Sequence, residues 1–165
     1  MLKVSADWLV VIVMIGFSVV GCGGPAGSTA AKHDDHGHAH DHPSQGPHAG
    51  ELIELGKEEY HAELIHDDAT HTITIYVLDG AAKAGVPIEA TELALNLLVE
   101  GKPQQFKLPA KPATGDPAGK SSCFALTDQA LCTALDTPKT TGRLNLTIAG
   151  KSYVGKISAH DHNHP

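Results

Sequence analysis

A run of alternating side chains at residues 71–79, His-Thr-Ile-Thr-Ile-Tyr-Val-Leu-Asp, constrains the fold of this 165-residue chain most strongly. Neighbouring side chains of an extended strand point to opposite faces, so the pattern places isoleucine and valine on one face and threonine and tyrosine on the other. Isoleucine, valine and threonine are branched at Cβ and favour strands over helices. The segment is therefore predicted to be a half-buried β-strand.

Seven further short apolar runs separated by turn residues accompany it, at residues 51–55, 59–66, 93–99, 104–108, 122–126, 143–148 and 152–157. Residues 128–135 are predicted to form two helical turns, with Thr127 as the N-cap. Many short strands with little helix indicate an all-β fold, an immunoglobulin-like antiparallel β-sandwich of about eight strands with one short helix. Residues 93–99 also fit a helix, which leaves the topology open.

Nine of the twelve histidines lie in two polar segments that flank this predicted domain. They are His33, His36, His38, His40, His42 and His48 before it, and His160, His162 and His164 after it. Imidazole is the commonest protein ligand for zinc, copper, nickel and cobalt. The chain is therefore predicted to bind a divalent transition metal, although affinity order favours copper in any such site and does not identify the ion.

Most of these histidines recur at every second residue, which suits an extended chain. On a helix, residues two apart point to nearly opposite sides, whereas on an extended chain they lie on one side, about 7 Å apart. Two such imidazole rings can therefore coordinate the same metal ion. Four aspartates lie among them and attract cations: Asp34, Asp35, Asp41 and Asp161. The alternative is a solvated low-complexity linker without a ligand.

Further ligands are expected from the domain itself. With an even number of strands running alternately up and down, the first strand begins and the last strand ends at the same end of the sandwich. The turn between the second and third strands lies there too. We therefore expect one cluster formed by His48 at the entry, by the turn and by His160 at the exit, the turn residues being His66, Asp67, Asp68 and His71.

The N-terminus reads as an export signal. Lys3 precedes an apolar run of thirteen residues, 8–20, which is too short to span a membrane and suits a signal peptide. The sequence Val19-Val20-Gly21-Cys22 resembles the lipobox of bacterial lipoproteins, which implies cleavage before Cys22 and lipidation of its thiol. The expected organisation is then a signal peptide at 1–21, a disordered His-rich tether at 22–50, the sandwich at 51–158 and a His-rich tail at 159–165. A secreted protein with a free Cys22 is the alternative.

The two remaining cysteines, Cys123 and Cys132, leave two alternatives open. In an oxidising compartment an even pair favours a disulfide that closes a short loop. The other alternative is two buried thiols, because a sequence does not give the separation between two sulfur atoms.

Charge and motifs exclude several classes of function. The net charge of −7 argues against nucleic acid as a partner, because phosphate binding needs clustered lysine and arginine. The chain contains no nucleophile elbow, no HExxH and no dinucleotide-binding glycine motif, so we do not expect an enzyme. Below about pH 6 the histidines protonate, and metal affinity is expected to fall because the ligand is neutral imidazole.

Residues 48–79 resemble a segment of small exported bacterial proteins and of regions beside the periplasmic adaptor subunits of heavy-metal efflux pumps. The similarity continues more loosely to Lys156. The pattern of that family has His-Gly-Gly before the first strand, and this chain has His48-Ala49-Gly50 instead. The resemblance implies a setting of metal transport and a heavy-metal efflux adaptor as a partner, and it assigns no ligand.

Two functions are compatible with these features. The leading hypothesis is a periplasmic metal-binding protein, anchored to the membrane by lipid at Cys22, that buffers a metal or delivers it to an efflux system. The alternative is a non-catalytic immunoglobulin-like interaction module whose histidines are incidental or sense pH.

We predict that the substitution Cys22→Ser leaves the protein without acyl chains, because the thiol that accepts the lipid is removed. Intact-mass analysis of the membrane fraction would show the acyl mass on the wild-type protein and its absence from the variant. A native protein without any acyl mass would contradict the lipoprotein assignment.

Overall fold

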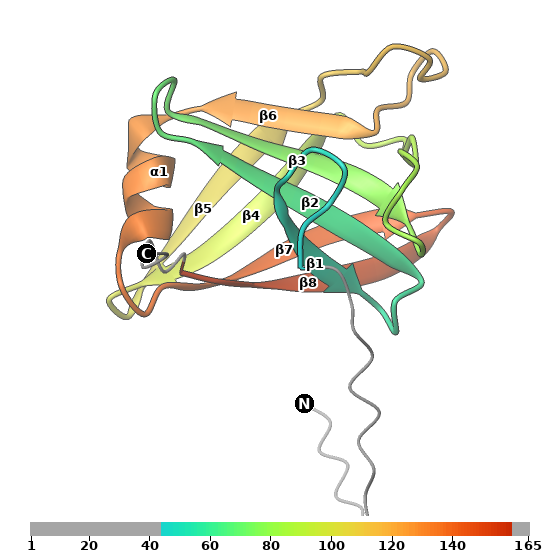
Figure 1. The fold of residues 1–165 in the computed structure, drawn as a ribbon. Helices are drawn as coiled ribbons and strands as arrows, with labels where there is room; N and C mark the ends of the chain where they lie inside the picture. Colours follow the sequence, from blue (N-terminus) through green and yellow to red (C-terminus); the bar gives the residue numbers. More distant parts are fainter. Residues whose placement is uncertain (1–43, 160–165) are drawn as a thin grey trace, which may run out of the picture. The chain divides into compact units, whose positions relative to one another are not determined.

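The computed structural model describes residues 44–159 as an antiparallel β-sandwich of eight strands with one short helix (Figure 1). No helix in this part of the chain is long and apolar enough to cross a membrane. The elements in chain order are β1 (Glu51–Leu55), β2 (Tyr60–Asp67), β3 (Thr72–Asp79), β4 (Glu92–Val99), β5 (Lys102–Pro109), β6 (Cys123–Thr127), α1 (Gln129–Asp136), β7 (Thr141–Ile148) and β8 (Lys151–Ser158).

The strands form two four-stranded sheets, with the orders β1-β2-β3-β6 and β5-β4-β7-β8. In an immunoglobulin constant domain the first, second, fifth and fourth strands share a sheet, so this sandwich has the same architecture with its own strand order. The two sheets approach each other at both edges, where β1 neighbours β8 and β5 neighbours β6. A bridge between Ala110 and Phe124 joins the second of these edges.

The core lies between the two sheets and follows the alternation in the sequence. In β3 the side chains of Ile73, Ile75 and Val77 are buried, while the threonines between them lie on the outer face. From the other sheet, alternate leucines of β4 pack into the same cluster, which also includes Phe124. Burying one such side chain contributes about 1.5–3 kcal/mol, so the alternating residues dominate the stability of the sandwich.

Two hairpins of the second sheet are closed by two-residue turns with left-handed backbone. Glu100 and Gly101 connect β4 to β5, and Ala149 and Gly150 connect β7 to β8, with φ between 49° and 80°. Such turns match the right-handed twist of the strands and favour glycine at the second position. Residues 93–99 therefore lie in the first hairpin as a strand, which excludes the helical alternative.

The predicted helix is present, but its cap differs by one residue. The N-cap is Asp128, whose carboxylate Oδ1 accepts hydrogen bonds from the amides of Ala130 at 2.7 Å and Leu131 at 3.0 Å. The predicted cap, Thr127, instead ends β6, and its hydroxyl bonds to that of Thr72 on β3. Pairing with β3 thus keeps Thr127 extended and moves the start of the helix.

Cys123 and Cys132 are free thiols, and both are buried. Cys123 pairs with Tyr76 at the first residue of β6, whereas Cys132 lies on α1 beyond the other end of that strand. The structure therefore agrees with the alternative of two buried thiols, and a bridge between the two cysteines stays a prediction.

We predict that Asp128→Ala lowers the free energy of unfolding by about 1 kcal/mol, because two amides at the start of α1 lose their acceptor. Urea unfolding measures the change. The matched control is Gln129→Ala, at an exposed position next to the cap, which should change the stability by less than about 0.5 kcal/mol. Equal effects of the two substitutions would contradict the role of Asp128.

Candidate metal site

Three side chains that can bind a metal meet where α1 packs against the end of β2: His66, Asp68 and Asp136. Their ligand atoms all lie within 4.8 Å of one another. His66 Nε2 is 3.0 Å from Asp68 Oδ1, and His66 Nδ1 is 3.5 Å from Asp136 Oδ1. We call these three residues the His66 group.

Secondary structure explains why they meet. In β2, every second side chain from Ala62 through Leu64 to His66 lies on the inner face of the sheet, so the ring of His66 points between the sheets. Only 7 % of its side chain is exposed. Asp68 follows in the turn between β2 and β3, and Asp136 is the last residue of α1. The helix buries Leu131 and Leu135, which holds Asp136 over this end of the sandwich.

The two ring nitrogens of His66 face different carboxylates, which gives them different roles toward a metal. A histidine that binds a metal through one nitrogen usually donates its other N–H to a carboxylate, which fixes the tautomer and the ring orientation. Asp136 lies beside Nδ1 and suits that orienting role. Nε2 and Asp68 are then the pair that can hold an ion, and further ligands would have to come from elsewhere in the chain.

Two other residues of the predicted turn do not join this group. Oδ1 of Asp67 accepts hydrogen bonds from the amides of Ala69 and Thr70. A hydrogen bond from the side chain of Thr70 lowers the pKa of Asp67 most, and the bonds from the two amides lower it further. His71 has a left-handed backbone with φ of 50°, and its carbonyl accepts a hydrogen bond from the amide of Asp128. Both residues therefore shape the turn.

The thiol of Cys132 lies near the His66 group. Burial raises its pKa, and the negative charges of Asp136 and Asp68 raise it further. Cys132 also belongs to the buried apolar cluster between the sheets and packs there.

His48 lies apart from the His66 group, in a second polar cluster on the outer face of the first sheet. Its Nδ1 is 2.7 Å from Oε2 of Glu63, and its ring stacks on Tyr76 with centroids 3.9 Å apart. Oε1 of Glu63 accepts hydrogen bonds from the amides of His48 and Gly50. His48, at the entry of the domain, therefore does not join the turn residues in the single cluster that the sequence predicts.

The segment before β1 folds over this glutamate. Glu63 is completely buried, and a Cβ added to Gly46 would lie within 3 Å of its carboxylate. Further bonds join Ser44 to Leu52 and Gly46 to Gly50. Residues 44–50, the described part of the predicted disordered tether, are ordered instead, because a buried carboxylate needs their amides as donors. We call residues 44–50 the N-terminal hook.

Sequence reasoning did not find Asp136 or Glu63 as members of these clusters. Asp136 is the last residue of a helix that starts 63 residues after His66, and no local pattern connects them. Glu63 interrupts the apolar pattern of β2 and was a detectable signal, because a carboxylate inside a buried strand requires donors. The predicted ligands outside the described residues are His33, His36, His38, His40, His42, His160, His162 and His164, and the predicted lipidation site Cys22 lies outside them too.

No protein-family model, no curated protein and no solved structure matches this chain.

We predict that Glu63→Ala lowers the free energy of unfolding by about 2 kcal/mol or more. The hook loses the acceptor for the amides of His48 and Gly50 and for the imidazole, and bonds to a charged group are the stronger kind. Urea unfolding measures the loss. Glu54→Ala, at an exposed position on β1, serves as the control and should change little. A variant at residue 63 as stable as the wild type would contradict the anchoring role.

Proposed function

We propose that this protein is a lipid-anchored periplasmic metal-binding protein that buffers a divalent transition metal or delivers it to a heavy-metal efflux system. Zinc, copper, nickel and cobalt all suit its ligands. The observation that carries the proposal is the concentration of nine histidines in two flanking segments, with the His66 group on the domain between them. The role is non-catalytic, and the anchor is the lipid expected on Cys22.

The position where the C-terminal segment leaves the fold supports this proposal. The amide of Ala159 donates to the carbonyl of Thr140 at 2.9 Å. Thr140 follows Asp136 by four residues, a chain length of at most about 14 Å. The segment with His160, His162 and His164 therefore begins within reach of the His66 group and can supply the ligands that this group lacks.

Charge supports the same function. The chain has a net charge of −7, and aspartates alternate with the flanking histidines. A negative potential raises the local concentration of cations and their rate of association. A site whose ligands come from separate segments of the chain is also less closed than a cage of four ligands, which suits buffering and delivery better than permanent storage.

A zinc titration of the full chain tests the proposal. We expect micromolar or tighter binding at neutral pH, and loss of most of it when His33, His36, His38, His40 and His42 are replaced by asparagine. The substitutions stop at residue 42 because His48 belongs to the hook and its loss would also disturb the fold. The matched control replaces the aspartates Asp34, Asp35 and Asp41 by asparagine, which removes charge but keeps every imidazole.

A second variant, His66→Asn, distinguishes the contribution of the domain to zinc binding from that of the flanking segments. If the His66 group takes part, zinc binding weakens while the five N-terminal histidines are intact. The absence of zinc and copper binding to the wild-type chain at neutral pH would contradict the proposal and would favour the interaction module.

A further inference from the structure

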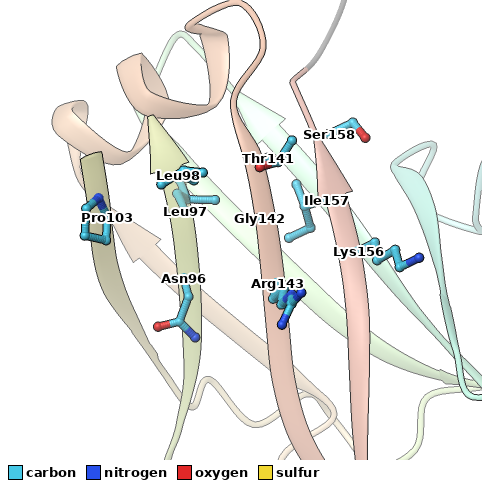
Figure 2. Close-up of a pocket in the computed structure, with 10 residues that line it drawn as sticks. All are labelled: Asn96, Leu97, Leu98, Pro103, Thr141, Gly142, Arg143, Lys156, Ile157 and Ser158. Atoms are coloured by element: carbon cyan, nitrogen blue, oxygen red, sulfur yellow. The ribbon is translucent and has the colours of Figure 1, made fainter. Parts of the chain in front are cut away.

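The outer face of the second sheet carries a groove of about 480 Å³ that crosses its four strands (Figure 2). Asn96 lines it from β4, Arg143 from β7 and Lys156 from β8. The strand register places these three side chains in one row across the sheet, and Gln105 of β5 extends the row at one end. Two amides therefore lie in line with two cations on this outer face.

The row presents hydrogen-bond donors to a ligand. Oδ1 of Asn96 accepts a hydrogen bond from Nε2 of Gln105 at 2.6 Å, which engages the acceptor of this amide. The next groups along the row are the amide nitrogen of Asn96, the guanidinium of Arg143 and the ammonium of Lys156, and all three only donate. Several donors side by side, two of them charged, suit an oxyanion such as a carboxylate.

The two cations of the row repel each other. Arg143 and Lys156 lie directly opposite each other on paired strands, and like charges in that arrangement destabilise a sheet. Among residues 44–159 no carboxylate forms an ion pair with either of them, whereas Lys107 and Lys151 have glutamate partners at 2.6 Å. An anionic ligand over the pair would offset the repulsion. The row is therefore complementary to negative charge.

Exposed apolar side chains lie on both sides of this row. Leu98 follows Asn96 by two residues on β4 and is 47 % exposed, and Val154 precedes Lys156 by two residues on β8 and is 52 % exposed. Because β4 and β8 each pair antiparallel with β7, they run in the same direction, so the two apolar side chains flank the row from opposite sides. Within residues 44–159 these are the large apolar side chains that remain exposed. Arginine beside exposed apolar side chains is typical of a protein interface.

Charge selects the class of partner for this face. A symmetric contact with a second copy would set Arg143 and Lys156 against the same two cations. The net charge of −7 disfavours nucleic acid. Anionic lipid surfaces are held by clusters of about four to eight cations, and the two cations of the row fall short of that number. An acidic protein partner satisfies both the cations and the apolar side chains beside them.

The size of the face limits the contact to a segment of that partner. Four strands of eight residues each give it a flat area of about 500 Å². A standard interface between two globular proteins takes about 800 Å² from each partner, which is more than this face offers. An extended peptide fits it, because its side chains recur on one side every 7 Å or about the distance between successive rows of the sheet.

We propose that this face binds an extended acidic segment of a partner protein, with its carboxylates on Arg143 and Lys156 and its apolar side chains on Leu98 and Val154. The guanidinium of Arg143 can hold a carboxylate through two parallel hydrogen bonds, whereas the ammonium of Lys156 acts as a point charge. The surface does not rest on the metal-binding function proposed above, because its residues lie outside the histidine segments and the His66 group.

Fluorescence anisotropy with a labelled synthetic peptide tests the surface on the full, metal-free chain at low ionic strength. The peptide Ser-Leu-Ser-Glu-Ser-Glu-Ser-Leu-Ser carries two glutamates between two leucines on one side when extended, and its control has glutamine in place of glutamate. We expect the glutamate peptide to bind about tenfold more tightly than the control. Arg143→Glu should abolish this preference. Lys83→Glu makes a charge reversal at an exposed position outside the groove and should leave the preference unchanged.

Two further measurements separate binding from folding. Leu98→Ser should weaken both peptides alike, because it removes an apolar contact and keeps the charges. Urea unfolding checks that Arg143→Glu is folded, and we expect this variant to be no less stable than the wild type. A glutamate opposite Lys156 replaces a repulsion by an attraction, so a loss of peptide binding cannot then be assigned to unfolding.

Several outcomes overturn the surface. Equal binding of the two peptides, or no binding, refutes it, and a preference that persists in Arg143→Glu places the site elsewhere. Self-association, or binding to phosphatidylglycerol vesicles, that Arg143→Glu removes would assign the face to a second copy or to a membrane. Zinc titration is independent, because Arg143→Glu should bind zinc as the wild type does. Failure of peptide binding therefore refutes the surface alone, and failure of zinc binding refutes the proposed function alone.

Discussion

The apolar contact between the inner faces of the two sheets is the constraint on which the rest of this structure depends. Every second residue of β2, β3 and β4 is committed to it, which forces the residues between them onto the outer faces. The polar features of the domain therefore occur only where the core ends or on the outer faces. His66 lies at the end of the core, Glu63 on one outer face, and Arg143 on the other.

Two buried polar side chains of β2 are stabilised in different ways. Glu63 is completely covered, and main-chain amides of the hook together with the imidazole of His48 replace its water. His66 lies between two partly exposed carboxylates, 69 % and 36 % exposed, that remain accessible to an ion. The first arrangement is closed and holds the chain in place, whereas the second is open on one side and is the better candidate for binding.

Charge is distributed unevenly along the chain and over the domain. On the second sheet the single arginine, Arg143, lies directly opposite Lys156, and no carboxylate of residues 44–159 forms an ion pair with either side chain. Three aspartates, Asp34, Asp35 and Asp41, precede the hook in the sequence, and the carbonyl of Ser44 in the hook accepts a hydrogen bond from the amide of Leu52 on β1. The hook therefore fixes where the N-terminal histidine segment joins the domain.

The sequence by itself determined the class of fold, seven of the eight strands and the presence of the helix, because alternation of side chains and turn residues are local signals. The structure decided that residues 93–99 form a strand. The sequence also showed the flanking histidines and aspartates, since composition needs no structure. Only the tertiary structure decided that Asp136 joins His66 and Asp68, that Glu63 anchors His48, and that Cys123 and Cys132 are buried as free thiols. These contacts depend on sheet order and on the path of α1, and strand pairing over long sequence separations leaves no periodic pattern in the chain.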